Sequence, residues 1–135
     1  SSDFSGADAA GVDFEKSELE GVNLEGAKLQ RSRFVGARAT NSNLRGANLS
    51  DANMGGARLD HSQLDGARMH NTNVARANLD ASGFRKAQLH GVMAEGTELC
   101  GTDFQEAELV DVNLRNACLD NSDFSQARLK GVCLQ

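Results

Sequence analysis

His70 and His90 are the residues best suited to metal binding, because they lie 20 positions apart in a chain whose pattern repeats at that interval. Two imidazoles can hold an ion together, but zinc sites generally have three or four protein ligands. His61 is out of step with this spacing and does not converge with the pair. We therefore expect His70 and His90 to form an exposed surface pair, and we predict no metal site and no other cofactor.

The three cysteines, Cys100, Cys118 and Cys133, form no CxxC motif and leave at least one thiol unpaired. We expect free thiols in a reducing compartment, since disulfides persist mainly in oxidising surroundings. A disulfide between Cys100 and Cys118 is the alternative. No signal peptide and no long apolar run is visible, so we expect a cytoplasmic protein without a membrane anchor.

Catalytic motifs are missing from the sequence: it contains no glycine-rich phosphate loop, no HExxH and no convergent Ser/His/Asp set. It also lacks Trp, Tyr and Pro, and its only aromatic residues of the Phe, Trp and Tyr group are six Phe. Such a chain can fill only a narrow core, which leaves no room for a substrate pocket. We predict that the protein has no catalytic residues and is not an enzyme.

A five-residue period organises these residues. Leu49, Met54 and Leu59 are five apart, and an equivalent inward position recurs from Phe4 to Leu134 without a slip. Two positions before each of these lies an Ala, Ser, Thr or Val. Five residues turn a helix by about 140°, and an odd step reverses the face of a strand. Both conflicts disappear if the chain turns a corner once per unit, which predicts a β-solenoid.

A second, longer period sets the number of sides. Ala recurs at every twentieth position from Ala7 to Ala127, and Phe84, Phe104 and Phe124 share one column with Phe4. Phe14 and Phe34 share another column. Four sides give about 6.75 coils, in a rod about 32 Å long. The residues that we expect to face the core include Phe4, Phe14, Leu24, Phe34, Leu44, Leu49, Met54, Leu59, Leu64, Leu79, Phe84, Leu99, Phe104 and Phe124.

The corners are predicted to differ from one another. The residue before each small inward residue is Gly or Asn in many units, and both tolerate the positive φ of tight turns. In other units the same place holds Arg, Asp, Glu or Lys. We therefore expect that some corners use turns that do not favour glycine.

Units such as Ala47–Asp51 and Ala77–Ala81 read A-[DN]-L-x-x, and the chain resembles the pentapeptide-repeat family over its whole length. The resemblance implies an all-β fold, a right-handed quadrilateral β-helix, and one uninterrupted domain over residues 1–135. It also implies a bacterial type of protein, where such repeats are commonest. Because neither end departs from the repeat, we expect a segment of a longer protein or a rod that associates end to end with another copy.

The four sides are numbered in chain order from the side that contains Phe4, so that Ala9, Phe14 and Leu19 lie on the second, third and fourth sides, and each corner residue is counted with the side before it. The charges are unevenly distributed over these sides. The net charge of −5 argues against direct nucleic-acid binding through a basic face. The fourth and first sides, which adjoin, together carry −7, whereas the opposite two carry +2. A solvated surface that prevents aggregation is one interpretation, and recognition of a basic partner is the other.

We therefore expect a non-catalytic scaffold rod that binds an unidentified protein, as a repeat domain of a larger bacterial protein; association with a secretion system or effector is one form of this hypothesis. The resemblance implies an alternative, because some pentapeptide-repeat proteins mimic DNA and shield DNA gyrase from quinolones. Those proteins typically carry a C-terminal helical module that this sequence lacks. The candidate acidic interaction face is Asp60, Asp80, Asp103 and Asp123.

Overall fold

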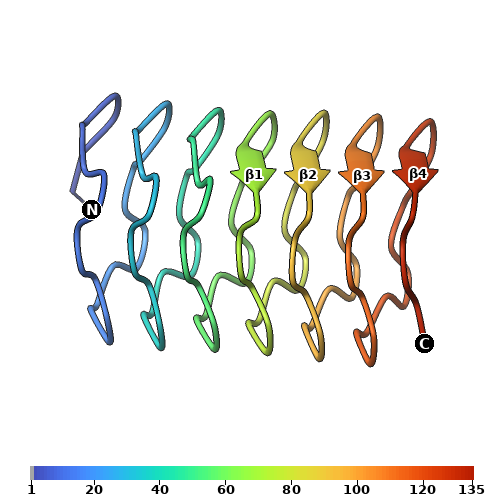
Figure 1. Cartoon of the computed structure of the whole chain (residues 1–135). Coiled ribbons are helices and arrows are strands. Elements are labelled where there is room, and N and C mark those ends of the chain that lie inside the picture. The colour runs from blue at the N-terminus through green and yellow to red at the C-terminus, as the bar shows by residue number, and fades with distance from the viewer. Residues whose placement is uncertain (1) are drawn as a thin grey trace.

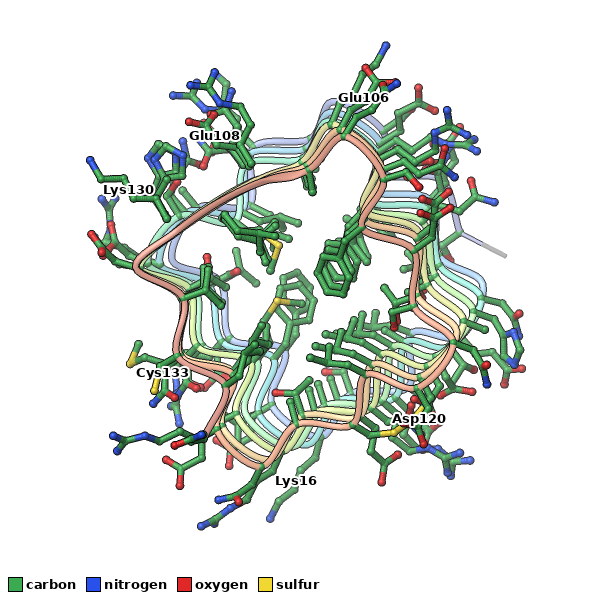
Figure 2. All side chains as sticks on the ribbon, turned by 90° about the vertical axis from the view of Figure 1, so that its right-hand side faces the viewer. Lys16, Glu106, Glu108, Asp120, Lys130 and Cys133 are labelled. Atoms are coloured by element: carbon green, nitrogen blue, oxygen red, sulfur yellow. A yellow bond between two sulfur atoms is a disulfide. The ribbon has the colours of Figure 1, made fainter. Side chains whose placement is uncertain are left out.

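The chain is a rod of stacked coils, as Figure 1 shows for the computed structural model, which describes residues 2–135. Parallel β-bridges join equivalent places in successive coils, such as Asn48 to Arg68 and Asn53 to Asn73. Viewed along its axis, the backbone outlines a four-sided ring, with residues such as Lys16 and Glu106 pointing outward from its corners (Figure 2). The predicted quadrilateral β-helix is therefore confirmed.

Within the described part of the chain, extended strands form on the second side only. These are β1 (Arg68–His70), β2 (Gln88–His90), β3 (Glu108–Val110) and β4 (Arg128–Lys130), which form one parallel sheet in that order. Elsewhere the coils are joined through single-residue bridges at the middle of each side. Within residues 2–135, the chain forms no helix with the length and apolar character needed to span a bilayer.

Backbone hydrogen bonds tie each coil to the next. The N–H of Leu49 donates to the carbonyl of Arg68 at 2.8 Å, and the N–H of Arg68 donates back to Ala47 at 3.0 Å. At the corner, Asp51 donates to the carbonyl of His70 at 2.8 Å, while Ala52 donates to Leu49 at 3.0 Å and closes the turn. The same arrangement recurs along the rod, so most backbone groups find partners without a conventional long-stranded sheet.

In units whose middle residue is Asn or Asp, that side chain accepts a hydrogen bond from the N–H of the residue after the bulky inward one. Asn48 Oδ1 accepts a hydrogen bond from the N–H of Ser50 at 3.1 Å. Asp103 Oδ1 does the same for Gln105 at 2.9 Å. Asn and Asp are the residues whose short side chains readily bond the backbone two residues ahead. This contact gives a physical reason for the Asn or Asp in the A-[DN]-L-x-x units.

The interior is filled by the two inward residues of each side. Phenylalanine rings stack between coils, with centroids 5.0 Å apart for Phe84 and Phe104 and 4.8 Å apart for Phe104 and Phe124. Buried hydroxyls are also satisfied, because Thr72 Oγ1 donates to the carbonyl of Leu49 at 2.7 Å. The apolar interior contains a cavity of only about 10 Å³, which is room for one water molecule at most.

The residues expected to face the core are placed as follows. Phe14 and Phe124, in the outer coils, are partly buried against the core. Phe4 is 50% exposed, because only one neighbouring coil covers it, and it lines the apolar hollow at this end of the core together with Phe14 and Leu24. The fully buried members are Leu24, Phe34, Leu44, Leu49, Met54, Leu59, Leu64, Leu79, Phe84, Leu99 and Phe104.

The corners all have the same backbone conformation, which corrects the expectation that they differ. From Gly6 to Gly131, every corner residue has a φ between 54° and 71°, whether it is Gly or not. Ala81 has a φ of 56° and Arg31 a φ of 58°. The coil-to-coil register imposes this turn on residues that disfavour it, since a left-handed conformation costs a residue with a Cβ about 1 kcal/mol or more.

Replacing Ala81 by Gly should therefore stabilise the rod. We expect Ala81→Gly to raise the free energy of unfolding by about 0.5 to 1 kcal/mol, measured by urea denaturation, because the positive φ favours glycine. Ala75→Gly is the matched control, because Ala75 does not have a positive φ and the same place one coil earlier is Gly55. The control should lose about 0.5 to 1 kcal/mol, and equal effects of the two changes would contradict this account of the corners.

Candidate functional site

Asp60 and Asp80 occupy the same outward place in successive coils of the fourth side. Asp80 Oδ1 accepts a hydrogen bond from the N–H of Cys100 at 2.8 Å, in a unit whose middle residue, Glu98, is not Asn or Asp. The N–H of Asp80 is already bonded to Asn78, at 3.0 Å. Asp60 Oδ1 consequently has no hydrogen-bond partner among residues 2–135, although that oxygen is buried. Of the two carboxylates, only that of Asp80 is tied to the next coil.

Asp103 and Asp123 are bridge partners in adjacent coils of the first side. Asp123 Oδ1 accepts hydrogen bonds from the N–H of Ser125 at 2.8 Å and from its hydroxyl at 2.5 Å. The Ser125 hydroxyl is the main reason that the pKa of Asp123 lies below its ordinary value of 3.8, and the Ser125 N–H adds to this effect. Arg85 Nη1 lies 3.9 Å from Asp103 Oδ2. These two acids thus combine surface charge with a local structural role.

Arginines interrupt the acidic sides. Arg45 Nε lies 3.5 Å from Asp65 Oδ2, and Arg38 Nη1 lies 3.7 Å from Glu18 Oε1. Because exposed pairs contribute little to stability, their main effect is to divide the negative surface into separate patches. The structure stacks Asp60 with Asp80 and Asp103 with Asp123, but the two pairs lie on different sides of the coil.

The two histidines pair as the spacing predicts. His70 and His90 belong to β1 and β2, and their rings stack with centroids 4.7 Å apart. Both are half-buried, which corrects the expectation of an exposed surface pair. Neither Nε2 has a hydrogen-bond partner within residues 2–135. His90 Nε2 lies 3.7 Å from Glu108 Oε1. The coil spacing brings the rings face to face and covers part of each one.

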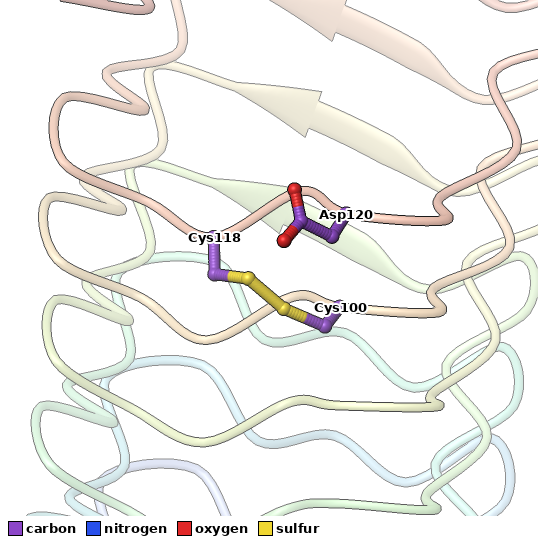
Figure 3. A group of neighbouring side chains, drawn as sticks. All are labelled: Cys100, Cys118 and Asp120. Carbon is purple, nitrogen blue, oxygen red and sulfur yellow. A yellow bond between two sulfur atoms is a disulfide. The ribbon is translucent and has the colours of Figure 1, made fainter.

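The expectation of free cysteines is wrong for two of the three. Cys100 and Cys118 form a disulfide between adjacent coils, with their Cα atoms 5.6 Å apart (Figure 3). Their sequence separation of 18 falls two short of a full coil, so their outward side chains meet diagonally. Asp120 lies beside the disulfide in Figure 3. Cys133 is free, and a hydrogen bond from Arg115 Nε at 3.3 Å lowers the pKa of its thiol.

The third side has a recess that was not predicted from the sequence. Its volume is about 420 Å³, and its floor is formed where small outward residues, Gly55 and Ala75, follow one another in adjacent coils. Asn53 and Asn73 form one wall and are joined by a hydrogen bond of 3.3 Å from Nδ2 to Oδ1. Two small residues at the same place in successive coils were the signal that could have revealed it. The other lining residues are Val35, Gly56, Arg76 and Glu95.

The geometry defines a β-solenoid repeat protein whose charged side chains, among the described residues, lie on its outer sides. The family model for pentapeptide repeats matches eight copies, in residues 1–36, 17–56, 42–80, 82–119 and 107–135. The chain therefore belongs to the pentapeptide-repeat family. No protein with a curated description matches it.

Two solved structures share the fold. The chain is similar to HetL, a pentapeptide repeat protein involved in the regulation of heterocyst differentiation in the cyanobacterium Nostoc sp. strain PCC 7120, with 25% identity and a TM-score of 0.76 over 98% of this chain and 70% of HetL. It also resembles a trypsin-treated form of QnrB1, a plasmid-mediated fluoroquinolone resistance protein. That match has 22% identity and a TM-score of 0.53, over 98% of this chain and 77% of the other.

Removing the Ser125 hydroxyl should change the titration of Asp123. We expect Ser125→Ala to raise the pKa of Asp123 toward 3.8, because that hydroxyl makes the largest contribution to its lowering. Ionised Asp123 stabilises the folded state, and this stabilisation is fully present at pH values above its ordinary pKa of 3.8. It is lost as the pH falls from that value through the lowered pKa. Over this pH range, the free energy of unfolding should therefore fall less in Ser125→Ala than in the wild type.

A carboxyl titration by NMR measures the pKa of Asp123 in the wild type and in the variant, and urea denaturation over the same pH range measures the difference in stability. Asp3 is the internal control, because its own lowered pKa arises mainly from the N–H of Ser5 and should not respond to Ser125→Ala. If the pKa of Asp123 does not change in the variant, the assigned role of the Ser125 hydroxyl is wrong.

Proposed function

We propose that this protein is a non-catalytic scaffold whose outer sides bind a protein partner. The filled interior carries this proposal, because a cavity of about 10 Å³ cannot admit a substrate, whereas the outward residues are held in straight columns by the coil register. The similarity to HetL, which is involved in regulating differentiation, supports a regulatory or binding role rather than a catalytic one. We further propose that the rod acts as a domain of a larger bacterial protein.

The fourth and first sides are the proposed binding surface, and the partner surface is basic. These two sides together carry −7, and like charges gathered on one edge attract an oppositely charged partner and orient it on approach. Asp60 and Asp80 would contribute from the fourth side, with Asp103 and Asp123 from the first. The arginines between them make the surface suited to one arrangement of charges on the partner rather than to any basic protein.

A topoisomerase such as DNA gyrase is the second candidate partner, with the rod standing in for DNA. The specific observation in its favour is the pairing of Asp103 with Asp123, which places carboxylates one above another along the axis, as phosphates follow one another along a nucleic-acid strand. In that case the four aspartates would take the place of DNA phosphates, and the Arg85 contact at Asp103 would reduce the negative charge at one of these positions.

Charge-neutralised variants distinguish these candidates. Asp60→Asn, Asp80→Asn, Asp103→Asn and Asp123→Asn are combined in one variant, because an asparagine retains the Oδ1 acceptor that bonds Cys100, Gln105 and Ser125. The matched control, Asp8→Asn, Asp51→Asn, Glu95→Gln and Asp111→Asn, changes the net charge equally on the other two sides.

Two readouts are used with these variants. Under the scaffold proposal, the wild type and the control should retain the same basic protein from a bacterial lysate, and the variant with all four substitutions (the four-fold variant) should not retain it. None of the three proteins should inhibit purified gyrase in a supercoiling assay. Inhibition of gyrase by the wild type that the four-fold variant loses would establish the second candidate. Equal behaviour of the four-fold variant and the control in both assays would exclude the acidic surface from binding.

End-to-end association with a second copy also belongs to this proposal. Its support is the exposure of apolar residues in the outermost coils, with Phe4 50%, Leu129 53% and Leu134 61% exposed. We expect the mass measured by light scattering to rise above 14.3 kDa with protein concentration, because stacking two rods would bury these side chains. Leu134→Lys should reduce the rise, whereas Met93→Lys, which changes an exposed apolar residue at a side of an inner coil, should not. A mass that stays at the value of a single chain at every concentration would exclude this association.

We propose the cytoplasm as the location, and the Cys100–Cys118 pair bears directly on that proposal. Cytosolic reductants keep most thiols reduced, whereas secreted proteins retain their disulfides. In the cytoplasm the pair would therefore exist largely as two thiols, and in an oxidising compartment as the disulfide that the structure contains.

A further inference from the structure

We propose that Cys100, Cys118 and Asp120 bind a zinc ion when the disulfide is reduced, so that the oxidation state of the cysteines controls metal binding. The two sulfur atoms and a carboxylate oxygen of Asp120 all lie within 4.8 Å of one another. Figure 3 shows the carboxylate directed toward the two sulfurs from the same coil as Cys118. This proposal is independent of the scaffold function.

The fold holds these three residues close together even without the disulfide. Cys100 and Asp120 occupy the same place in adjacent coils, and Cys118 lies two residues before Asp120. The coils are joined here by hydrogen bonds from Leu99 to the carbonyl of Cys118 at 2.9 Å and from Gly101 to the carbonyl of Asp120 at 2.7 Å. Because these bonds are made by the backbone, reduction of the disulfide leaves the spacing of the coils in place.

The ligand set suits zinc better than the common hard cations. Thiolates are soft ligands that select zinc and copper(I), whereas magnesium and calcium prefer a shell of oxygen atoms. Two sulfurs and one oxygen supply three of the four positions of a tetrahedral zinc ion. The fourth position would hold water or a side chain of a binding partner, since Cys100 and Cys118 are half-buried and Asp120 is exposed.

The local charge favours a cation. The fourth side carries −4, and Asp80 bonds the N–H of Cys100 itself. The histidine pair offers a useful contrast: among residues 2–135, Cys100, Cys118 and Asp120 form the one group of three such ligands within that distance, so His70 and His90 lack a third.

The redox step is balanced by a thiol or phosphine reductant. Two equivalents of a thiol deliver two electrons and two protons, which break the Cys100–Cys118 bond, form two thiols and leave the reductant as its own disulfide. Binding of Zn²⁺ then displaces the two thiol protons. The sulfurs cannot form the disulfide and bind the metal at the same time. A low-molecular-weight disulfide that accepts the two electrons and takes up two protons to become two thiols would therefore re-form the Cys100–Cys118 bond and release the ion.

Cobalt(II) is the probe for this site, because it replaces zinc and its thiolate complexes absorb light. The full chain is reduced with a phosphine under nitrogen and titrated with Co²⁺, and then with Zn²⁺. We expect a sulfur-to-cobalt charge-transfer band that saturates at one ion per chain and disappears as Zn²⁺ displaces the cobalt. The oxidised protein should give no band.

Variants assign the ligands. Cys100→Ser and Cys118→Ser should abolish the band, and Asp120→Asn should weaken Co²⁺ binding by at least about tenfold, a loss found even for residues that only support a metal ligand. Cys133→Ser and Asp51→Asn, which changes an acid on the second side, are the matched controls and should bind Co²⁺ as the wild type does. Zinc should also raise the melting temperature of the reduced wild type, but not that of Cys118→Ser.

Several outcomes would overturn the proposal. These are the absence of a band in the reduced wild type, a band that persists in Cys118→Ser, and a band that depends on Cys133. Unchanged affinity in Asp120→Asn would remove the carboxylate from the site. Loss of the rod's circular dichroism spectrum on reduction would also count against the proposal, because it requires the coils to keep their spacing without the disulfide.

Discussion

The hydrogen bond from the N–H of each bulky inward residue to a carbonyl of the next coil, as from Leu49 to Arg68, holds the whole rod in register. A coil cannot slip along its neighbour without breaking all of these bonds together. Side chains at equivalent places in successive coils are therefore brought into line wherever they occur. The stacked rings of Phe84 and Phe104 and the paired imidazoles follow directly from this constraint. The same register lets Cys100 and Cys118 meet across the diagonal between two different places.

Structure and recognition are not separate on the surface of this molecule. Asp103 and Asp123 satisfy backbone N–H groups inside their own units, yet their charge belongs to the surface proposed to bind a partner. Asp65 has a similar double role: its Oδ1 accepts a hydrogen bond from the N–H of Arg85 at 2.9 Å, and the same oxygen lies 2.8 Å from the position that a Cβ on Gly83 would take. Negative charge is thus compatible with the fold at these places, and the carboxylates need no separate scaffold to hold them.

The fold could be predicted because a slip-free period of five excludes both a straight helix and a straight strand, and the Phe columns then select four sides. The details that could not be predicted depend on distances between side chains in adjacent coils rather than on the order of residues along the chain. Ala81 adopts a positive φ against its own preference because its neighbours in the stack impose it. Cys100 and Cys118 lie in successive coils of the fourth side, but their sulfurs meet only because the diagonal between their two different outward places is short enough. The recess depends on the small size of Gly55 and Ala75, and this signal becomes visible only when the two positions are recognised as neighbours in the stack.

The identical turn at every corner has an evolutionary consequence. Because each corner has the same conformation and each side has the same length, one five-residue unit can be gained or lost without leaving a gap in the core. Every unit beyond that point would then lie on the side next to its former one. A column of outward residues before the change would therefore line up with residues that formerly belonged to a neighbouring side. A single duplication could thus redirect half of the surface by a quarter turn, and new binding faces could arise without any substitution.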